Sequence, residues 1–236
     1  MAYRWVAAAV EGFVQQLAVA YIAHGYWFYV RGWIPEHKDA AATDRKILRQ
    51  YGIAVSKWSR ARRKKTGQAN VQYLRYGRFY VILATHGQHP FFAAEQKQIQ
   101  DFRRHPLYFM GYSIGCRRAR GGGDYHASVR IQREIHEVLK ARFRQAAIQK
   151  SVEELERELW SIPYERYAPV RSQLLGILRV INRRRQVAGL EPVPREALRL
   201  RRFPVRPFGA ETGKDTTNPA KEVVRNRPWP TTAFDG

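Results

Sequence analysis

Two closely spaced histidines are the residues of this chain best suited to metal chemistry. His86 and His89 lie in the run Thr85-His86-Gly87-Gln88-His89-Pro90, directly after an apolar segment. Two imidazoles can ligate a divalent ion such as Mg²⁺ or Mn²⁺, which would polarise a scissile phosphate. The same pair also suits an ordinary turn, and this interpretation is favoured. No cofactor is therefore expected, and a divalent metal enters only with a phosphate-cleaving alternative.

At the level of the fold, the histidine pair after a central strand resembles the HUH nickases of replication initiators, relaxases and small transposases. That resemblance implies a metal-dependent nicking endonuclease with a tyrosine nucleophile on a later helix, for which Tyr164 and Tyr167 are the candidates. The family places one hydrophobic residue between its histidines, whereas two residues, Gly87 and Gln88, intervene here. With this spacing, His86 and His89 point to the same side of the chain only if the strand has ended in a turn. The nickase is kept as the enzymatic alternative, and a non-enzymatic role is favoured.

Clustered cations are the strongest chemical signal. The 236 residues include 42 Lys and Arg against 20 Asp and Glu, a formal charge of +22, which indicates a polyanionic partner. Six cations lie between Lys57 and Lys65, and Trp58 beside them suits base stacking between phosphate contacts. The predicted nucleic-acid contacts are Lys57, Trp58, Arg60, Arg62, Arg63, Lys64, Lys65, Arg75, Arg78, Arg117, Arg118, Arg120, Arg183, Arg184 and Arg185.

Aromatic side chains are dense on the strands expected near these cations. The stretch Tyr76-Gly77-Arg78-Phe79-Tyr80-Val81 resembles the aromatic strand of RNA-recognition sheets, although it does not match that module's signature. On an open sheet, rings that point outward stack on unpaired bases. Tyr73, Tyr76 and Tyr80 are the predicted stacking residues, and packing of the same rings in the core is an equal alternative.

These signals predict a nucleic-acid-binding protein, for RNA or single-stranded DNA, in a nucleoprotein complex or a mobile element. Besides the nickase, a structural subunit of a ribonucleoprotein assembly with protein neighbours is the other alternative. A single cysteine, Cys116, excludes an intramolecular disulfide framework and indicates a cytoplasmic, intracellular protein. Hydrophobic residues make up 44% of the chain, which excludes a wholly disordered polycation.

An α+β domain over residues 1–132 is expected to position these residues. It is predicted as a mainly antiparallel five-stranded sheet, in ferredoxin-like or RRM-like order, with helices on one face. Apolar positions at helical spacing between Trp5 and Val30 predict an amphipathic helix rather than a membrane span. Runs rich in aromatic and β-branched residues predict strands at 26–30, 71–76, 78–85, 107–116 and 125–131. Capping and turn residues predict helices at 44–51, after Thr43, and at about 92–102.

A helical module over residues 133–190 is expected to follow. Its helices are predicted from Arg133 to about Gln149, from a capping box at Ser151 and Glu154, and from about Pro169 to Gly189. The segment 191–236 is rich in proline and arginine and is predicted to be an extended or disordered tail.

Overall fold

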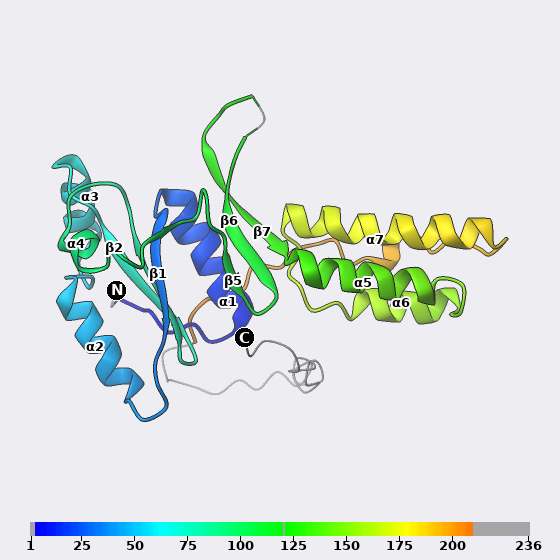
Figure 1. The fold of residues 1–236 in the computed structure, drawn as a ribbon, viewed down its shortest axis with the longest axis horizontal. Coiled ribbons are helices and arrows are strands. Elements are labelled where there is room, and N and C mark those ends of the chain that lie inside the picture. Colours follow the sequence, from blue (N-terminus) through cyan, green and yellow to red (C-terminus); the bar gives the residue numbers. More distant parts are fainter. Residues whose placement is uncertain (1–2, 120, 210–236) are drawn as a thin grey trace.

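Two antiparallel sheets form the strand-rich part of the protein, in place of the single five-stranded sheet expected. The computed structural model describes residues 3–119 and 121–209 (Figure 1). Within them the sheets have the orders β2-β3-β1-β4 and β5-β6-β7. The strands are β1 (Phe28–Trp33), β2 (Val71–Tyr76), β3 (Phe79–Ala84), β4 (Gln100–Asp101), β5 (Leu107–Phe109), β6 (Tyr112–Arg118) and β7 (Tyr125–Ile131). The α+β class and the antiparallel pairing are confirmed, and the prediction of one sheet is wrong.

A tight turn at Met110 and Gly111 accounts for part of this difference. Both residues have left-handed φ angles, 45° and 78°, as in a two-residue type I′ hairpin turn. Phe109 therefore pairs with Tyr112, and the stretch predicted as one strand folds back on itself as β5 and β6. The resulting hairpin joins β7 to make the second sheet.

Helices cover both faces of the four-stranded sheet, although one covered face was expected. On one face lies α1 (Val10–Gln15), which continues through a π-helical turn, Gln16–Tyr21, and a 3-10 turn, Ile22–His24. On the other face lie α2 (Ala40–Gln50) and α4 (Pro90–Ala94), whose apolar residues pack with Tyr73 and Ile82 of the sheet. Because both faces are covered, β2 is buried at its first four positions and does not alternate between core and solvent.

One aromatic residue of α1 joins the two sheets. The ring of Phe13 lies 5.9 Å from that of Phe79 on β3 and 4.4 Å from that of Phe109 on β5. This helix is the amphipathic segment expected near the N-terminus. None of the helices in the described ranges combines the length and apolar character needed to cross a membrane.

Three helices form the module that follows β7, as the periodicity predicts. They are α5 (Arg133–Ala146), α6 (Val152–Trp160) and α7 (Ala168–Val187), and they project beside the sheets (Figure 1). The capping box of Ser151 and Glu154 is present at the start of α6. Gln173 of α7 exchanges two side-chain hydrogen bonds with the backbone of Ile131, which fixes the module to the end of β7.

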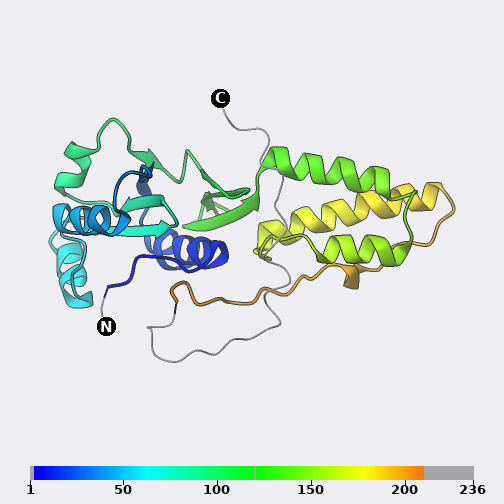
Figure 2. The ribbon, with the colours of Figure 1, turned by 90° about the horizontal axis from the view of Figure 1, so that it is seen from below.

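The chain after α7 is extended and packed against the body up to residue 209. It contains the 3-10 turn Arg195–Ala197 and returns from the far end of the helical module toward α1 (Figure 2). Asn182 exchanges hydrogen bonds of 2.8 and 2.9 Å with Val193, and the Gln15 side chain accepts one from the amide of Val205. The rest of the predicted tail, 210–236, lies outside the described residues.

Candidate nucleic-acid interface

The predicted basic segment forms a surface helix, α3 (Lys57–Lys65), in which no residue is buried. Ser56 caps its N-terminus by accepting a 3.1 Å hydrogen bond from the amide of Ser59. Its last turn contains four cations, Arg62, Arg63, Lys64 and Lys65. Positive charge there interacts favourably with the negative end of the helix dipole and stabilises the helix. The fold gains little apolar burial from this helix, so packing in the core does not explain its residue types.

The cations of α3 have no acidic partners in the part of the chain that the structure describes. Ion pairs there join other residues, and no carboxylate lies within 4.0 Å of an α3 cation. Arg60 and Arg63 donate to the backbone carbonyls of Val55 and Gly52, at 2.7 and 3.2 Å. Their charge is still uncompensated, since a carbonyl is neutral. The helix is therefore a concentrated source of positive potential.

Trp58, in the first turn of α3, has 86% of its surface exposed. Single exposed apolar residues are common on protein surfaces. Here, however, the indole stands beside six cations, the combination that single-strand-binding grooves use to stack bases while holding phosphates.

A second group of rings and guanidinium groups lies between the two sheets. The Arg103 guanidinium is 4.6 Å from the Trp27 ring and 5.7 Å from the Tyr125 ring, and the Arg118 guanidinium is 5.1 Å from the Tyr125 ring. The Trp27 and Tyr125 rings also lie against each other, with their centroids 5.6 Å apart and an interplanar angle of 58°, so Arg103 lies beside both rings. We name Trp27, Arg103, Tyr125 and Arg118 the cation–π ladder. The ladder begins beside β1 and ends on the β6–β7 hairpin.

The loop after β3 connects this ladder to α3. His86 lies in that loop, with its ring 4.7 Å from Phe28 and 5.7 Å from Trp27. Two residues later, Gln88 donates to the carbonyl of Gly67 and accepts from the amide of Ala69, just beyond the end of α3. A continuous series of contacts therefore runs from α3 through His86 and the ladder to the hairpin. We call this surface the basic–aromatic strip, and it comprises Lys57–Lys65, His86, Trp27, Phe28, Arg103, Tyr125, Arg117 and Arg118.

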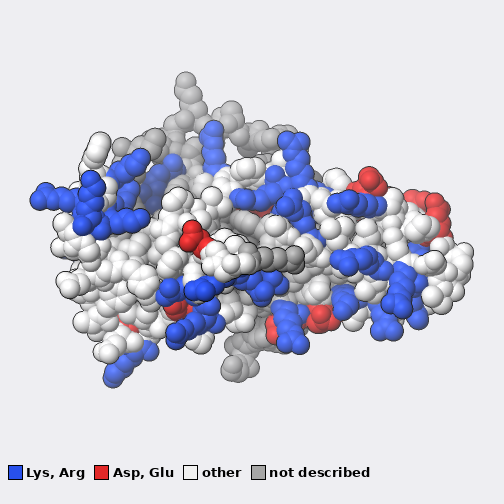
Figure 3. Space-filling model, turned by 90° about the horizontal axis from the view of Figure 1, so that it is seen from above, with Lys and Arg blue, Asp and Glu red and all other residues white. Residues whose placement is uncertain are grey.

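Cations gather over α3 and are also spread over the rest of one face of the molecule (Figure 3). In Figure 3, Lys and Arg gather at the left end, which carries α3, and no acidic side chain is seen within that group. Arg117 and Arg118 are exposed near the tip of the hairpin. Arg120, also predicted as a contact, lies outside the described residues.

The predicted stacking tyrosines do not form an open aromatic sheet. Tyr73 is completely buried, and its hydroxyl donates a 2.6 Å hydrogen bond to Asp44, so it offers no face to a base. Tyr76 is half-buried, 6.0 Å from the Phe109 ring, and Tyr80 is half-buried, 5.9 Å from the Tyr73 ring. Of the two alternatives, core packing is the correct one for Tyr73, because α2 covers its face of the sheet.

Three of the predicted phosphate contacts have structural partners instead. Arg75 forms a largely buried ion pair with Asp44, with a 2.8 Å separation between Nη2 and Oδ2. Arg78 donates to backbone carbonyls of the segment after β1, among them Pro35 at 2.7 Å. Arg185 is buried and donates to the carbonyls of Ala147 and Lys150, both at 2.9 Å. Each of these guanidinium groups serves the fold.

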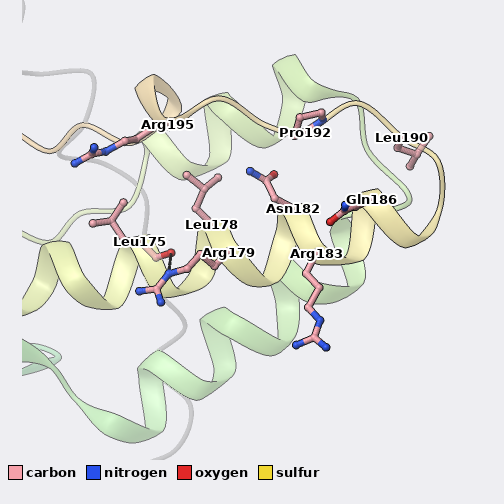
Figure 4. A pocket seen from close by; sticks show the side chains of 9 residues that line it. All are labelled: Leu175, Leu178, Arg179, Asn182, Arg183, Gln186, Leu190, Pro192 and Arg195. Carbon is pink, nitrogen blue, oxygen red and sulfur yellow. Dashed lines mark hydrogen bonds between the residues drawn. The ribbon is translucent and has the colours of Figure 1, made fainter.

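Arg183 and Arg184 remain exposed on α7, away from these structural roles. Arg183 lines a groove between α7 and the returning tail, together with Arg179 and Arg195 (Figure 4). Arg179 donates a 3.2 Å hydrogen bond to the carbonyl of Leu175 within its own helix. This groove is a second, separate cationic region.

His89 has a local structural role, in line with the turn interpretation favoured from the sequence. Its Nδ1 accepts a 3.1 Å hydrogen bond from the amide of Phe91 and so caps α4. Burial and the nearby charge of Arg63 lower its pKa. No group of three or more His, Cys, Asp or Glu side chains suited to a metal ion occurs among the described residues. Burial raises the pKa of Tyr164 and of Tyr167 to about 12, which opposes the activation that a nucleophilic tyrosine needs.

Sequence reasoning missed the ladder because its members are far apart in the chain. Arg118 was predicted as a nucleic-acid contact and Trp27 lies in the strand predicted at 26–30, but nothing local marks Arg103 and Tyr125 as their neighbours. Only the approach of the two sheets brings these four side chains together. Comparisons of the chain with protein-family models, with curated proteins and with solved structures found no match.

Proposed function

We propose that this protein binds nucleic acid through the basic–aromatic strip, with α3 as the principal phosphate-binding element. The observation that carries this proposal is the set of cations on α3 that have no acidic partner among the described residues, on a helix that buries no residue. Repulsion among six adjacent cations costs free energy in the absence of a polyanion. A phosphate backbone would remove that cost.

A cation-rich helix without base-reading geometry favours contacts to phosphate over recognition of a sequence. Neutralising phosphates releases condensed counterions, so affinity falls with salt, with a slope of about 0.7 per contact for single strands and about 0.9 for duplexes. Electrostatic binding of this kind also speeds association. The proposal keeps the intracellular setting expected from the composition.

The test removes the four α3 cations that have no hydrogen-bonded partner among the described residues. In the variant, Lys57, Arg62, Lys64 and Lys65 are replaced by alanine, and binding of labelled oligonucleotides is followed by fluorescence anisotropy across a salt series. We expect weaker binding and a slope of log affinity against log salt that is lower by up to about 3 for a single strand.

A matched control removes the same amount of charge elsewhere. Arg133, Arg144, Arg157 and Arg171 are exposed, lie outside the strip and outside the groove beside α7, and are replaced by alanine in the control variant. Because both variants have the same net charge, a difference between them reports local contacts rather than the field of the whole protein. Equal affinities and equal slopes for the two variants would contradict the assignment of α3.

A further inference from the structure

We propose that the cation–π ladder and His86 hold unpaired bases, so that the ligand of the strip is a single strand rather than a duplex. This inference rests on the proposed function, since it names the class of nucleic acid that the strip accepts. It depends on a different set of residues, however. The phosphate contacts lie on α3, whereas the stacking surfaces lie in the loop after β3 and on the β6–β7 hairpin.

The inner and outer guanidinium groups of the ladder differ in their charge balance. Arg103 is paired with Asp101 through a 2.6 Å contact between Nη2 and Oδ2, and this carboxylate neutralises it. Arg118 has no carboxylate partner in the described parts of the chain and is exposed. The inner group thus serves to hold Trp27 and Tyr125 in place. The outer one presents a charged plane to whatever lies on the hairpin.

Arg118 lies on Tyr125 at a distance typical of a cation–π contact, 5.1 Å. A guanidinium group fixed in this way still has its second plane available, because no other described ring lies within cation–π distance of it. Nucleobases stack on guanidinium planes as well as on aromatic rings. A base placed there would stack on the plane of Arg118 that faces away from Tyr125.

His86 offers a second stacking surface at the other end of the ladder. The side chain is exposed, and its ring is nearly perpendicular to those of Phe28 and Trp27, at 87° and 85°. These contacts restrain the imidazole without any described ring stacking parallel to it. A restrained planar group loses little conformational entropy when a base stacks on it.

The position of the two surfaces explains why a single strand is favoured. Both belong to the series of contacts that starts just beyond the end of α3, and the proposed strand has its phosphates on α3 and its bases on His86 and Arg118. In a duplex the faces of the bases are already covered by their neighbours, and these planar groups gain nothing. Stacking also depends little on base identity, so sequence preference should be weak.

The experiment compares four probes with the full-length protein. They are a labelled single-stranded DNA, its RNA counterpart, the same DNA with abasic sites in place of its bases, and a duplex of equal length. The abasic strand keeps the phosphates and loses the stacking faces. We expect the DNA and RNA single strands to bind at least about 10-fold more tightly than the abasic strand, which corresponds to one stacked base.

A charge-conserving variant assigns this difference to the ladder. His86→Ala combined with Arg118→Lys removes both exposed planar groups and keeps the positive charge at position 118. We expect the ratio of base-containing to abasic affinity to fall by about 10-fold, with abasic affinity unchanged. The control, His37→Ala with Arg144→Lys, makes the same changes at exposed positions outside the strip and should leave the ratio unaltered.

Three of the outcomes separate the stacking proposal from the proposed function. Equal binding of the base-containing and abasic strands by the wild-type protein would overturn the stacking proposal and leave phosphate binding by α3 intact. An equal loss of affinity for both strands in the variant would also overturn it, since stacking acts only on bases. Binding to none of the four probes would refute the proposed function and this inference together. Binding of the duplex as tightly as the DNA single strand would also overturn the stacking proposal, because the base faces of a duplex are covered.

Discussion

Two arginine-rich segments of this protein have opposite roles. Both α3 and the last turns of α7, at Arg183-Arg184-Arg185, were expected from sequence to contact nucleic acid. In α3 no residue is buried, and its cations lack acidic partners in the described ranges. In α7, by contrast, Arg185 is 4% exposed and donates hydrogen bonds to three backbone carbonyls, those of Ala147, Lys150 and Glu191.

The difference lies in what surrounds each helix. Arg185 lies where the chain leaves α5 and where the returning tail passes α7, so unpaired carbonyls of both segments are within its reach. At α3 only Arg60 and Arg63 reach backbone carbonyls of the described residues, one each, in the segment that follows α2, and neither guanidinium is buried. The same residue type is therefore a structural clamp in one place and a free charge in the other. The number of cations in a segment does not distinguish the two roles. The number of hydrogen-bond acceptors that each cation reaches in the folded protein does.

The largest expected effect concerns a third predicted contact, Arg75, and its buried partner. Asp44 is 1% exposed and accepts hydrogen bonds from Trp5, Tyr73 and Arg75. Replacing it by alanine leaves a buried guanidinium without its counter-charge, so we expect Asp44→Ala to lower the free energy of unfolding by about 3–5 kcal/mol. Chemical denaturation measures this change.

Asp124→Ala is the control for that experiment, because Asp124 is exposed on the hairpin. We expect it to change stability by less than about 0.5 kcal/mol. A loss below about 1 kcal/mol for Asp44→Ala would mean that Arg75 is available to a ligand after all, and would return it to the set of phosphate contacts.

A smaller effect tests the clamp in α7 directly. Arg185→Ala removes the donor shared by three carbonyls, two of which it reaches at 2.9 Å. Leaving buried carbonyls unsatisfied costs about 1–3 kcal/mol each before relaxation and water entry, so we expect a net loss of about 3 kcal/mol. The adjacent Arg184 is exposed, and Arg184→Ala should cost less than about 0.5 kcal/mol. Equal losses of stability for the two variants, measured by thermal unfolding, would show that Arg185 is no more important to the fold than the exposed Arg184.

A third effect shows how the free charge of α3 acts on its surroundings. Burial and the charge of Arg63 lower the pKa of His89 below its ordinary value of 6.5, which favours the neutral ring in the folded state. The unfolded chain therefore binds the proton more readily, and the stability due to neutral His89 falls as the pH drops below 6.5 and through the folded-state pKa. Protonation also ends acceptance by Nδ1 of the Phe91 amide.

His89→Asn keeps a side-chain acceptor at the cap and removes the titration. Between about pH 7.5 and pH 5 we expect the wild-type protein to lose about 1 kcal/mol more stability than this variant, the usual value of a helix cap. Denaturant unfolding at the two pH values gives the comparison. A parallel decline in both proteins would show that other groups account for the pH dependence.

Local pattern predicted much of the secondary structure. The β2–β3 hairpin follows from two strand-like runs around Gly77, which has a left-handed φ of 56°. The helices of the 133–190 module follow from apolar spacing and from the Ser151 capping box. The turn at Met110 was missed because methionine rarely takes a left-handed φ, so nothing in its type marks a hairpin there.

The site was predicted less completely, and for a related reason. The basic run of α3 is contiguous in sequence, so its charge and exposed position could be inferred from composition alone. Tyr73 was predicted to stack on bases, with core packing as an equal alternative, and α2 covers its face of the sheet and makes it core. The cation–π ladder depends on pairing between distant segments, which single-residue patterns do not encode. Groups of residues that are neighbours in the sequence were thus predictable, whereas groups that only the fold brings together were not.

The smallest expected effect is the most direct test of the comparison between α3 and α7. Lys64→Ala with Lys65→Ala removes two exposed cations from the last turn of α3. The loss of favourable charge at the helix C-terminus, about 0.3–1 kcal/mol per charge, opposes the relief of repulsion between neighbouring cations. We therefore expect the free energy of unfolding to change by no more than about 0.5 kcal/mol.

Binding should respond differently to the same two substitutions. If both lysines contact phosphate, the slope of log affinity against log salt for a single strand falls by about 1.4, which is 0.7 for each contact. Unfolding and salt titration on one preparation should then show a large change in binding and a small change in stability for the α3 variant. For Arg185→Ala in α7 we expect a large change in stability and a small change in binding. A stability loss of several kcal/mol in the α3 variant would show that these lysines stabilise the fold. Removing a surface charge that has no partner breaks no such interaction and changes stability little.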